Sequence, residues 1–425
     1  IGDWALRIQD PRKVIANHTS LVVAEIVFTF LLLIFFLAFR YRGRYLITWF
    51  GVFALGLILE NIRFLNPQMD IFFHSPGILT LFGMRTPLYV VLGMYHMLLY
   101  IAYVMARKLR LPWWAQGPAC GLLLLLIDFP VHFMGVKLLW WQWHDSEANF
   151  LDRSYSVPWV MYSFDAFIGS SFIWTLHALR WLFLSSKYDW MLWMREMVCA
   201  ISAGAIALVI AIHTSVPVLI SIALYAIVVI IADRNNLDED ARSFRKQFWF
   251  DELACAICIH YIFFMSLPVV ADPQNIVSEG LHQPIWSCNV IEEKSFFNNL
   301  VLTRQKYLCP TNYNADYFDF HCNPYQNALD RITEIPLEWY AICGLDFTNR
   351  MEYIFIIWSF SFISLVIFYQ ILASSGPLPL EPVKVFIFQF ILLFFYLSIF
   401  VNFFFKSLLS TTCQAKILMV NEKEK

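Results

Sequence analysis

The chain has 425 residues, of which 59% are hydrophobic and 15% are charged, and its formal net charge is −2. Soluble domains usually carry about 25% charged residues, so this composition excludes an ordinary soluble protein and indicates a polytopic membrane protein. The near balance of acidic and basic residues gives no sign of nucleic acid as a partner.

Apolar segments of about 20 residues, the length that crosses a bilayer core, recur along the chain. The turn Thr214–Pro217 is expected to divide the long segment 197–230 into two short helices. The predicted fold is therefore an all-α polytopic integral membrane protein with about ten transmembrane helices. The predicted spans are 21–39, 45–64, 87–106, 118–139, 157–179, two within 197–230, 248–270, 353–371 and 385–405.

The orientation follows from the short basic loops, which stay in the cytosol. The basic loops are 40–44, 107–110, 185–196 and 233–247, and the third is predicted to be a short interfacial helix. The N-terminus then faces the lumen or the cell exterior, where Asn17 of the sequon Asn17-His18-Thr19 is a predicted glycosylation site.

The chain divides into five predicted regions. These are a lumenal N-terminal segment (1–20), a membrane domain of about eight spans (21–270), a lumenal loop (271–350), the last two spans (351–405) and a polar tail (406–425).

Tryptophans are expected to mark the two membrane surfaces, because their rings favour the headgroup zone. Trp113 and Trp114 are expected at the inner surface, and Trp140, Trp141, Trp143 and Trp159 at the outer one.

The lumenal loop holds four of the nine cysteines, Cys288, Cys309, Cys322 and Cys343. An even set of cysteines in a small, loop-rich module of an oxidising compartment predicts two disulfides. The sequence leaves all three pairings open. A zinc site is the weaker interpretation, because the loop contains no CxxC pair. Cys255 and Cys258 do have that spacing, but they lie in an apolar span and are interpreted as small hydrophobic residues.

Ionisable residues at membrane depth are costly and usually face a bundle interior. Here they concentrate in the second to fifth spans. Asp128 and His132 are four residues apart and share one helix face. We expect these side chains to line one pocket that opens outward and to form a ligand-binding site. The predicted site residues are Glu60, Arg63, His96, Asp128, His132 and Asp165.

Three interpretations of this polar cluster stay open. Glu60, Asp128 and His132 are candidate catalytic residues for acid–base work on a buried lipid. The same three residues with His96 are candidate metal ligands. The third interpretation is a hydrogen-bonded network that joins helices or contacts a ligand, and it is the one we favour. Accordingly, neither a bound metal nor a cofactor is expected.

Residues 45–180 resemble the carotenoid hydratase family of membrane proteins. The matching features are Glu60, Pro87-Leu88, Asp128, Trp140-Trp141-Gln142-Trp143, Tyr155 and Val157-Pro158-Trp159. This resemblance implies addition of water to a polyene end group, with Glu60 and Asp128 as the acidic residues. The chain departs from the pattern at Tyr162 and Ser163, where an Asn is expected, and its cysteine-bearing loop and last two spans have no counterpart in that family.

The whole chain is similar to animal, especially nematode, polytopic membrane proteins that carry a domain of unknown function. Some proteins of this kind are subunits of assemblies that move lipid between organelles. The similarity implies a non-enzymatic membrane subunit, in the endoplasmic reticulum rather than the plasma membrane, that binds membrane lipids and docks a larger protein partner. The alternative is a hydratase- or lyase-like membrane enzyme that acts on an isoprenoid or other lipid.

Overall fold

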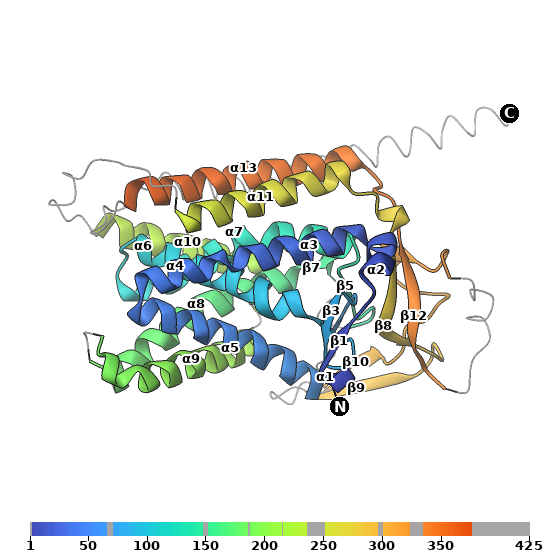
Figure 1. The fold of residues 1–425 in the computed structure, drawn as a ribbon, viewed down its shortest axis with the longest axis horizontal. Coiled ribbons are helices and arrows are strands. Elements are labelled where there is room, and N and C mark those ends of the chain that lie inside the picture. The colour runs from blue at the N-terminus through green and yellow to red at the C-terminus, as the bar shows by residue number, and fades with distance from the viewer. Residues whose placement is uncertain are drawn as a thin grey trace.

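The computed structural model describes residues 2–65, 71–147, 152–185, 188–214, 216–235, 251–295, 301–323 and 335–375. Within these residues, seven helices are long and apolar enough to cross a membrane. The helices lie roughly alongside one another, and most of the strands gather at one end of them (Figure 1). The predicted tenth span (385–405) and the polar tail lie outside the described residues.

Helices occupy each predicted span that the structure describes. The first span comprises α3 (Thr19–Phe30), a 3₁₀ turn (Leu31–Leu33) and α4 (Ile34–Tyr41), and the third comprises π-helical segments at Val90–Met94 and His96–Tyr100 followed by α6 (Ile101–Lys108). The others are α5 (Gly43–Leu65), α7 (Trp113–Lys137), α8 (Trp159–Phe183), α9 (Trp193–His213), α10 (Val218–Asn235), α11 (Glu252–Val270) and α13 (Arg350–Ser375). How many of them cross the bilayer remains a prediction.

The segment 197–230 does form two helices, α9 and α10, which are separated at the predicted turn. The expected interfacial helix over 185–196 is wrong. Asp189 accepts a hydrogen bond from the Met191 amide at 2.9 Å and starts a 3₁₀ turn, Trp190–Leu192, which continues directly into α9. The 3₁₀ turn and the first residues of α9 therefore occupy the position of the predicted surface helix.

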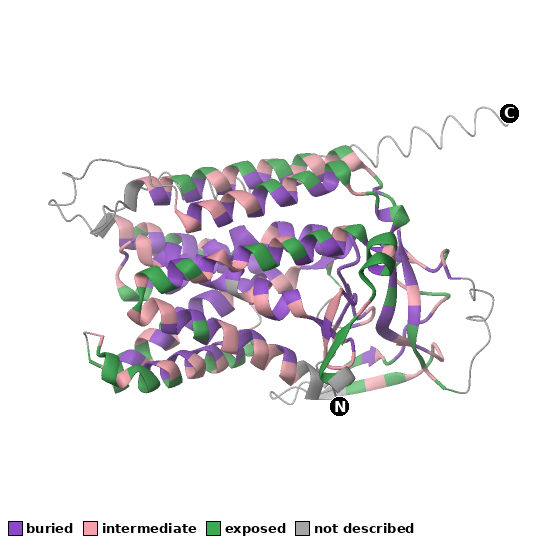
Figure 2. Ribbon diagram, viewed as in Figure 1, coloured by how far each residue is buried: buried purple, intermediate pink, exposed green. Residues whose placement is uncertain are grey.

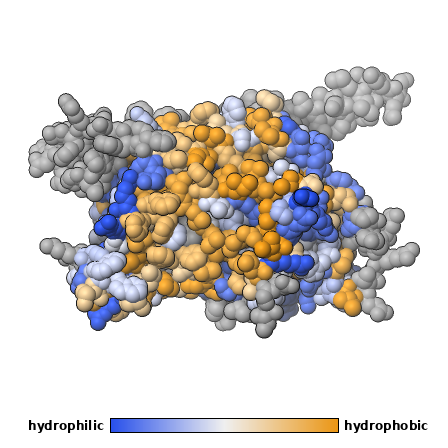
Figure 3. Space-filling model, viewed as in Figure 1, coloured by the Kyte–Doolittle hydropathy of each residue, from blue (hydrophilic) through white to orange (hydrophobic). Residues whose placement is uncertain are grey.

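Helix α7 lies at the centre of the bundle and is almost wholly buried. Figure 2 shows buried residues concentrated in the interior of the bundle and exposed ones along the outer helices. Those exposed positions are largely apolar, among them Ile206, Val209, Leu224 and Ile227. Figure 3 shows a hydrophobic band across the middle of one face of the molecule, with hydrophilic residues toward both ends. This is the surface expected of a protein immersed in a bilayer.

The strands at one end come from four parts of the chain, the N-terminus, the segment after α5, the segment after α7 and the segment after α11. Near the N-terminus, α1 (Gly2–Ala5) leads into β1 (Leu6–Ile8), which pairs with β3 (Leu79–Leu81), and β3 pairs with β4 (Thr86–Pro87). Strand β2 (Phe72–His74) pairs with β5 (Trp141–Trp143), and β6 (Arg153–Ser154) pairs with β7 (Val157–Pro158). Helix α2 (Pro11–Asn17) joins β1 to the first span and ends at the predicted glycosylation site, Asn17, which is half-buried.

The predicted lumenal loop is a strand-rich domain, so the all-α description holds only for the membrane part. Its main sheet has the order β11 (Phe318–Asp319), β12 (Leu337–Gly344) and β8 (Val277–Ile285), and β9 (Ile291–Ser295) pairs with β10 (Val301–Gln305). The four cysteines form the two predicted disulfides, Cys288–Cys309 and Cys322–Cys343. Apolar helices together with disulfides fit a membrane protein of the secretory pathway.

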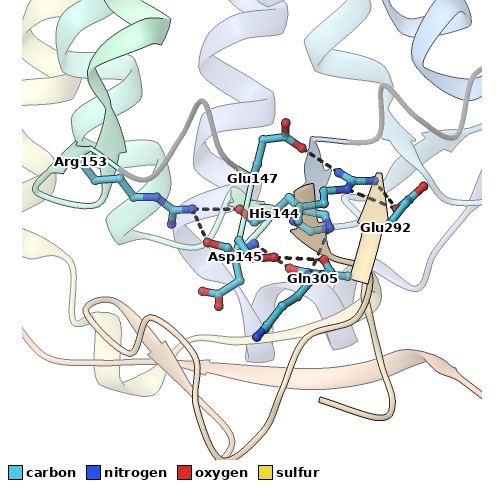
Figure 4. A network of polar contacts seen from close by, with 9 residues as sticks. His144, Asp145, Glu147, Arg153, Glu292 and Gln305 are labelled. Carbon is cyan, nitrogen blue, oxygen red and sulfur yellow. Dashed lines mark hydrogen bonds and ion pairs between the residues drawn. The ribbon is translucent and has the colours of Figure 1, made fainter. Parts of the chain in front are cut away.

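A polar network joins this domain to the segment after α7 (Figure 4). Arg304 of β10 pairs with Glu147 at 2.8 Å and with Glu292 of β9 at 3.2 Å. Gln283 of β8 accepts a hydrogen bond from the Asp145 amide at 2.8 Å. The carboxylate of Asp145 accepts one from the Asn314 amide at 2.9 Å, and burial raises the pKa of this group. The strand-rich domain is therefore attached to the helices through buried polar contacts.

A second ionic group lies at the opposite end of the bundle, among the basic loops. The Glu196 carboxylate accepts hydrogen bonds from Nε of Arg44 at 2.7 Å and from Nε of Arg180 at 3.0 Å. Arg180 also donates to the Thr48 hydroxyl at 2.9 Å. We call these four residues the inner cluster. It joins α5, α8 and α9, and both oxygens of its one carboxylate are engaged.

Candidate functional site

The polar residues of α7 and α8 meet in the half of the bundle nearest the strands. Nε2 of His132 lies 3.1 Å from Oδ2 of Asp165 and 3.4 Å from Oδ2 of Asp128, and all three residues are buried. We call them the Asp–His–Asp cluster. At 1.5 Å of rise per residue, Asp128 lies about 14 Å from the end of α7. The cluster is thus well inside the helical bundle.

The sequence brings these side chains together through helix periodicity and close helix packing. Asp128 and His132 are on one face of α7 because they are four residues apart. Asp165 reaches them because α7 and α8 cross closely, at Gly121 and Gly169. A Cβ at Gly121 would lie 2.3 Å from the carbonyl oxygen of Ala166, so any larger residue there would push the helices apart. Small residues allow such close contact between membrane helices.

Pro130 lies between Asp128 and His132 and lacks the amide that would bond to the carbonyl of Leu126. The hydroxyl of Tyr261 in α11 donates to that carbonyl at 2.9 Å, and Nε2 of the neighbouring His260 is 2.9 Å from the Ile127 carbonyl. Helix α11 thereby satisfies the backbone that the proline leaves open. These contacts support the backbone of α7 beside the cluster, and they show that His260 serves the packing of α11 against α7.

Aromatic rings surround His132. Its ring centroid lies 6.0 Å from that of Trp141, 6.3 Å from Trp143 and 5.8 Å from Tyr162. Trp141 packs against Gly135 of α7, where a Cβ would lie 2.3 Å from the indole. The glycine one turn after His132 thus makes room for the ring. These three rings form an apolar wall beside the imidazole.

The Asp–His–Asp cluster leaves several buried polar atoms without a partner. Oδ1 of Asp128, Nδ1 of His132 and Nε1 of Trp141 make no hydrogen bond to any residue that the structure describes. An unpaired buried polar atom costs about 1–3 kcal/mol, and such atoms in native proteins call for an explanation. One of these atoms belongs to the His132 imidazole and the other two to residues that contact it, so they mark the place where a ligand would complete the structure.

Glu60, predicted to share this pocket, forms a separate group. Its carboxylate accepts hydrogen bonds from the Thr86 hydroxyl at 3.0 Å and from the Tyr95 hydroxyl at 2.8 Å, and Nε2 of His74 lies 3.9 Å away. Tyr95 lies between the two π-helical segments of the third span. Irregular helical turns of this kind are frequent at functional sites.

The indole of Trp141 lies between the two groups. Its ring is 6.3 Å from that of His74, its direct partner across the β2–β5 pair, and 6.0 Å from that of His132. The predicted single pocket is therefore two polar groups that share one aromatic wall. Arg63 lies in α5 and His96 in the second π-helical segment, but the positions of these two predicted site side chains lie outside what the structure describes.

The predicted tryptophan belt is wrong for the segment after α7. Trp140, Trp141 and Trp143 are buried, with exposed fractions of 0%, 3% and 2%. The chain reverses at Leu139, which has a φ of 54°, and β5 then pairs with β2 beneath the strand-rich domain.

The sequence analysis did not identify His74 and Thr86, the two residues that contact Glu60 from strands. Both belong to strands in the loop after the second span, a segment without any pattern that indicates membrane depth.

The cluster has the parts needed for ligand binding and for proton transfer. Asp165 orients His132 from one side, as a carboxylate orients the histidine of a general base, and the two carboxylates add hard oxygen ligands beside a nitrogen. Aromatic walls with a few convergent polar groups are typical of small-ligand sites. Geometry alone is compatible with each of the three sequence-based interpretations.

Comparison with known families gives one match. A family model described as a domain of unknown function (DUF7802) covers residues 1–373 of the chain. No curated protein matches the sequence, and no solved structure matches the fold.

Proposed function

The chain belongs to the DUF7802 family, and from the site itself we propose that it is a non-enzymatic membrane subunit that binds a lipid by its headgroup. In this proposal the protein resides in the endoplasmic reticulum, docks a larger protein partner and takes part in lipid transfer between membranes. The observation that carries the proposal is the Asp–His–Asp cluster, a buried polar site with unpaired atoms in the half of the bundle nearest the strand-rich domain.

Three features of the structure support a headgroup site. Lipid headgroups are polar and bind where a few converging polar atoms meet aromatic walls, as around His132. The cluster lies in the half of the bundle that we place toward the lumen, where a lipid of the lumenal leaflet has its headgroup. The strand-rich domain is attached over that end by the Arg304 and Gln283 contacts (Figure 4).

A hydratase- or lyase-like enzyme is the second candidate, and one observation favours it. Asp165 accepts from Nε2 of His132 at 3.1 Å, while Nδ1 on the other side of the ring has no partner among the described residues. A histidine oriented by a carboxylate with its second nitrogen unengaged is the arrangement of a general base.

Lipidomic mass spectrometry of the full chain, purified in mild detergent, tests the proposal. We expect a lipid species to be enriched over the bulk membrane and to be lost in Asp165→Asn. Glu25→Gln is the matched control, since Glu25 is also buried at this end but accepts its hydrogen bonds from the Ile78 amide. Equal lipid content in all three proteins would refute the headgroup site. If the purified protein converts a bound polyene, that result would support the hydratase- or lyase-like enzyme in place of the lipid-binding subunit.

The compartment and the partner have their own tests. An N-glycan on Asn17 that stays sensitive to endoglycosidase H would support the endoplasmic reticulum and the lumenal N-terminus, and its loss in Asn17→Gln would assign it. When the chain is tagged at its own chromosomal locus and purified, one large protein should be recovered with it in a constant molar ratio to the chain. A chain that migrates alone at its own mass after cross-linking would contradict the subunit role.

A further inference from the structure

We propose that Asp128, His132 and Asp165 bind one zinc ion. The proposed zinc site goes beyond the proposed function, because the ion is held whether or not a lipid binds beside it. Three observations carry this inference: the positions of the donor atoms, the charge of the group and its unpaired atoms.

The donor atoms have the spacing of a metal site. Zinc binds histidine nitrogen at about 2.0–2.1 Å and carboxylate oxygen at about 2.0–2.2 Å, so a tetrahedral ion separates neighbouring ligand atoms by about 3.4 Å. Nε2 of His132 lies 3.1 Å and 3.4 Å from the two Oδ2 atoms. One donor atom from each residue lies within 4.8 Å of the other two. An ion at their centre requires only small rotations of the carboxylates.

The charge of the group favours a divalent cation. Two carboxylates face one imidazole, and the ion pairs that the structure gives Asp128 and Asp165 all go to His132. If both carboxylates are ionised, even a protonated imidazole leaves one excess negative charge in the low-dielectric interior, which a cation or a proton on one carboxyl group must offset because an uncompensated charge there is very costly. With a divalent ion bound to neutral His132, the charges of ion and carboxylates cancel.

The surroundings fit a metal centre with an open position. Oδ1 of Asp128, a residue that is 6% exposed, has no partner among the described residues and is able to coordinate or to accept from a bound water. The rings of Trp141, Trp143 and Tyr162 form the hydrophobic shell that controls solvent access to a metal. One nitrogen and two oxygens from protein leave the fourth tetrahedral position for water. Imidazole with carboxylate suits zinc better than calcium or magnesium.

The test is metal analysis of the full chain, purified in detergent through a tag without histidines. Plasma mass spectrometry should find about one zinc per chain. His132→Gln and the double variant Asp128→Asn/Asp165→Asn should lose at least about ten-fold in zinc affinity. Glu25→Gln and Cys255→Ser/Cys258→Ser should keep the metal. Cobalt in place of zinc should give the visible bands of a tetrahedral site in the wild type and in the two controls.

If the cluster variants fail to fold, zinc binding is tested with the wild-type protein alone. After zinc is removed with a chelator, added zinc chloride should raise the melting temperature and restore one equivalent of bound metal. Purified wild type without zinc whose melting temperature does not respond to zinc chloride would overturn the proposal. So would zinc that persists in His132→Gln and disappears in Cys255→Ser/Cys258→Ser, since the metal would then belong to the cysteine pair of α11.

Discussion

The two ends of the helical bundle both contain buried ionic groups, and they differ in how completely those groups are paired. In the inner cluster, two guanidinium groups hold one carboxylate, and both carboxylate oxygens are engaged. In the Asp–His–Asp cluster, two carboxylates share one imidazole nitrogen, and other polar atoms have no partner among the described residues. A paired group of this kind holds helices together, whereas an unpaired one indicates that something else binds there.

The largest expected effect comes from breaking the inner cluster. Glu196→Gln would leave the buried Arg180 and the half-buried Arg44 without their counter-ion, and loss of one partner of a buried ion pair typically costs about 3–5 kcal/mol. We expect a clear fall in melting temperature in detergent. Arg195→Gln is the control, because Arg195 is the exposed neighbour on the same helix. A Glu196→Gln protein as stable as the control would show that the inner cluster is not structural.

Acid should destabilise the end that carries the strands. His282 of β8 is 1% exposed, and burial lowers its pKa to about 4. The unfolded chain, with an ordinary pKa near 6.5, takes up a proton that the folded domain does not accept. Stability is therefore unaffected above pH 7 and falls as the pH drops from 6.5 toward 4, by about 2 kcal/mol at pH 5.

The check is the melting temperature of the full chain at pH 7.5 and pH 5.0, compared with His282→Gln, which keeps a donor for the Ser278 carbonyl. The variant should lose part of the pH dependence. A remainder is expected from His18, whose pKa burial also lowers to about 4. Identical pH profiles for wild type and His282→Gln would refute the assignment.

A smaller effect should follow from loss of the contact that supports α7 beside the Asp–His–Asp cluster. Tyr261→Phe removes the hydroxyl that donates to the Leu126 carbonyl, and the lost hydrogen bond should cost about 1 kcal/mol. Tyr89→Phe is the control, because the buried Tyr89 hydroxyl makes no hydrogen bond to a described residue. If the two variants melt alike, the carbonyls freed by Pro130 do not depend on α11.

The sequence predicted the helices and the disulfides better than the site, for physical reasons. Long apolar segments can only be helices in a bilayer, and four cysteines in one polar loop have few alternatives. The same arguments also place Asp128 and His132 on one face. The meeting of His74 with Trp141, by contrast, depends on strands two or three residues long, whose pairing is fixed by tertiary contacts. Glu196 lies among basic residues, so nothing in its position indicated that Arg44 and Arg180 converge on it.

The smallest effect on stability is expected at the Asp–His–Asp cluster itself, and it separates the two ends most sharply. Asp128→Asn keeps an oxygen that accepts from His132 and removes one of two carboxylates that repel each other, so metal-free protein should change by less than about 1 kcal/mol. Binding should nevertheless suffer, because an amide oxygen is a weaker zinc ligand than a carboxylate. The measurement is the melting temperature of chelator-treated wild type and Asp128→Asn, followed by zinc titration of both. A metal-free loss as large as that of Glu196→Gln would mean that Asp128 is a structural counter-ion, and the contrast between the two ends would then disappear.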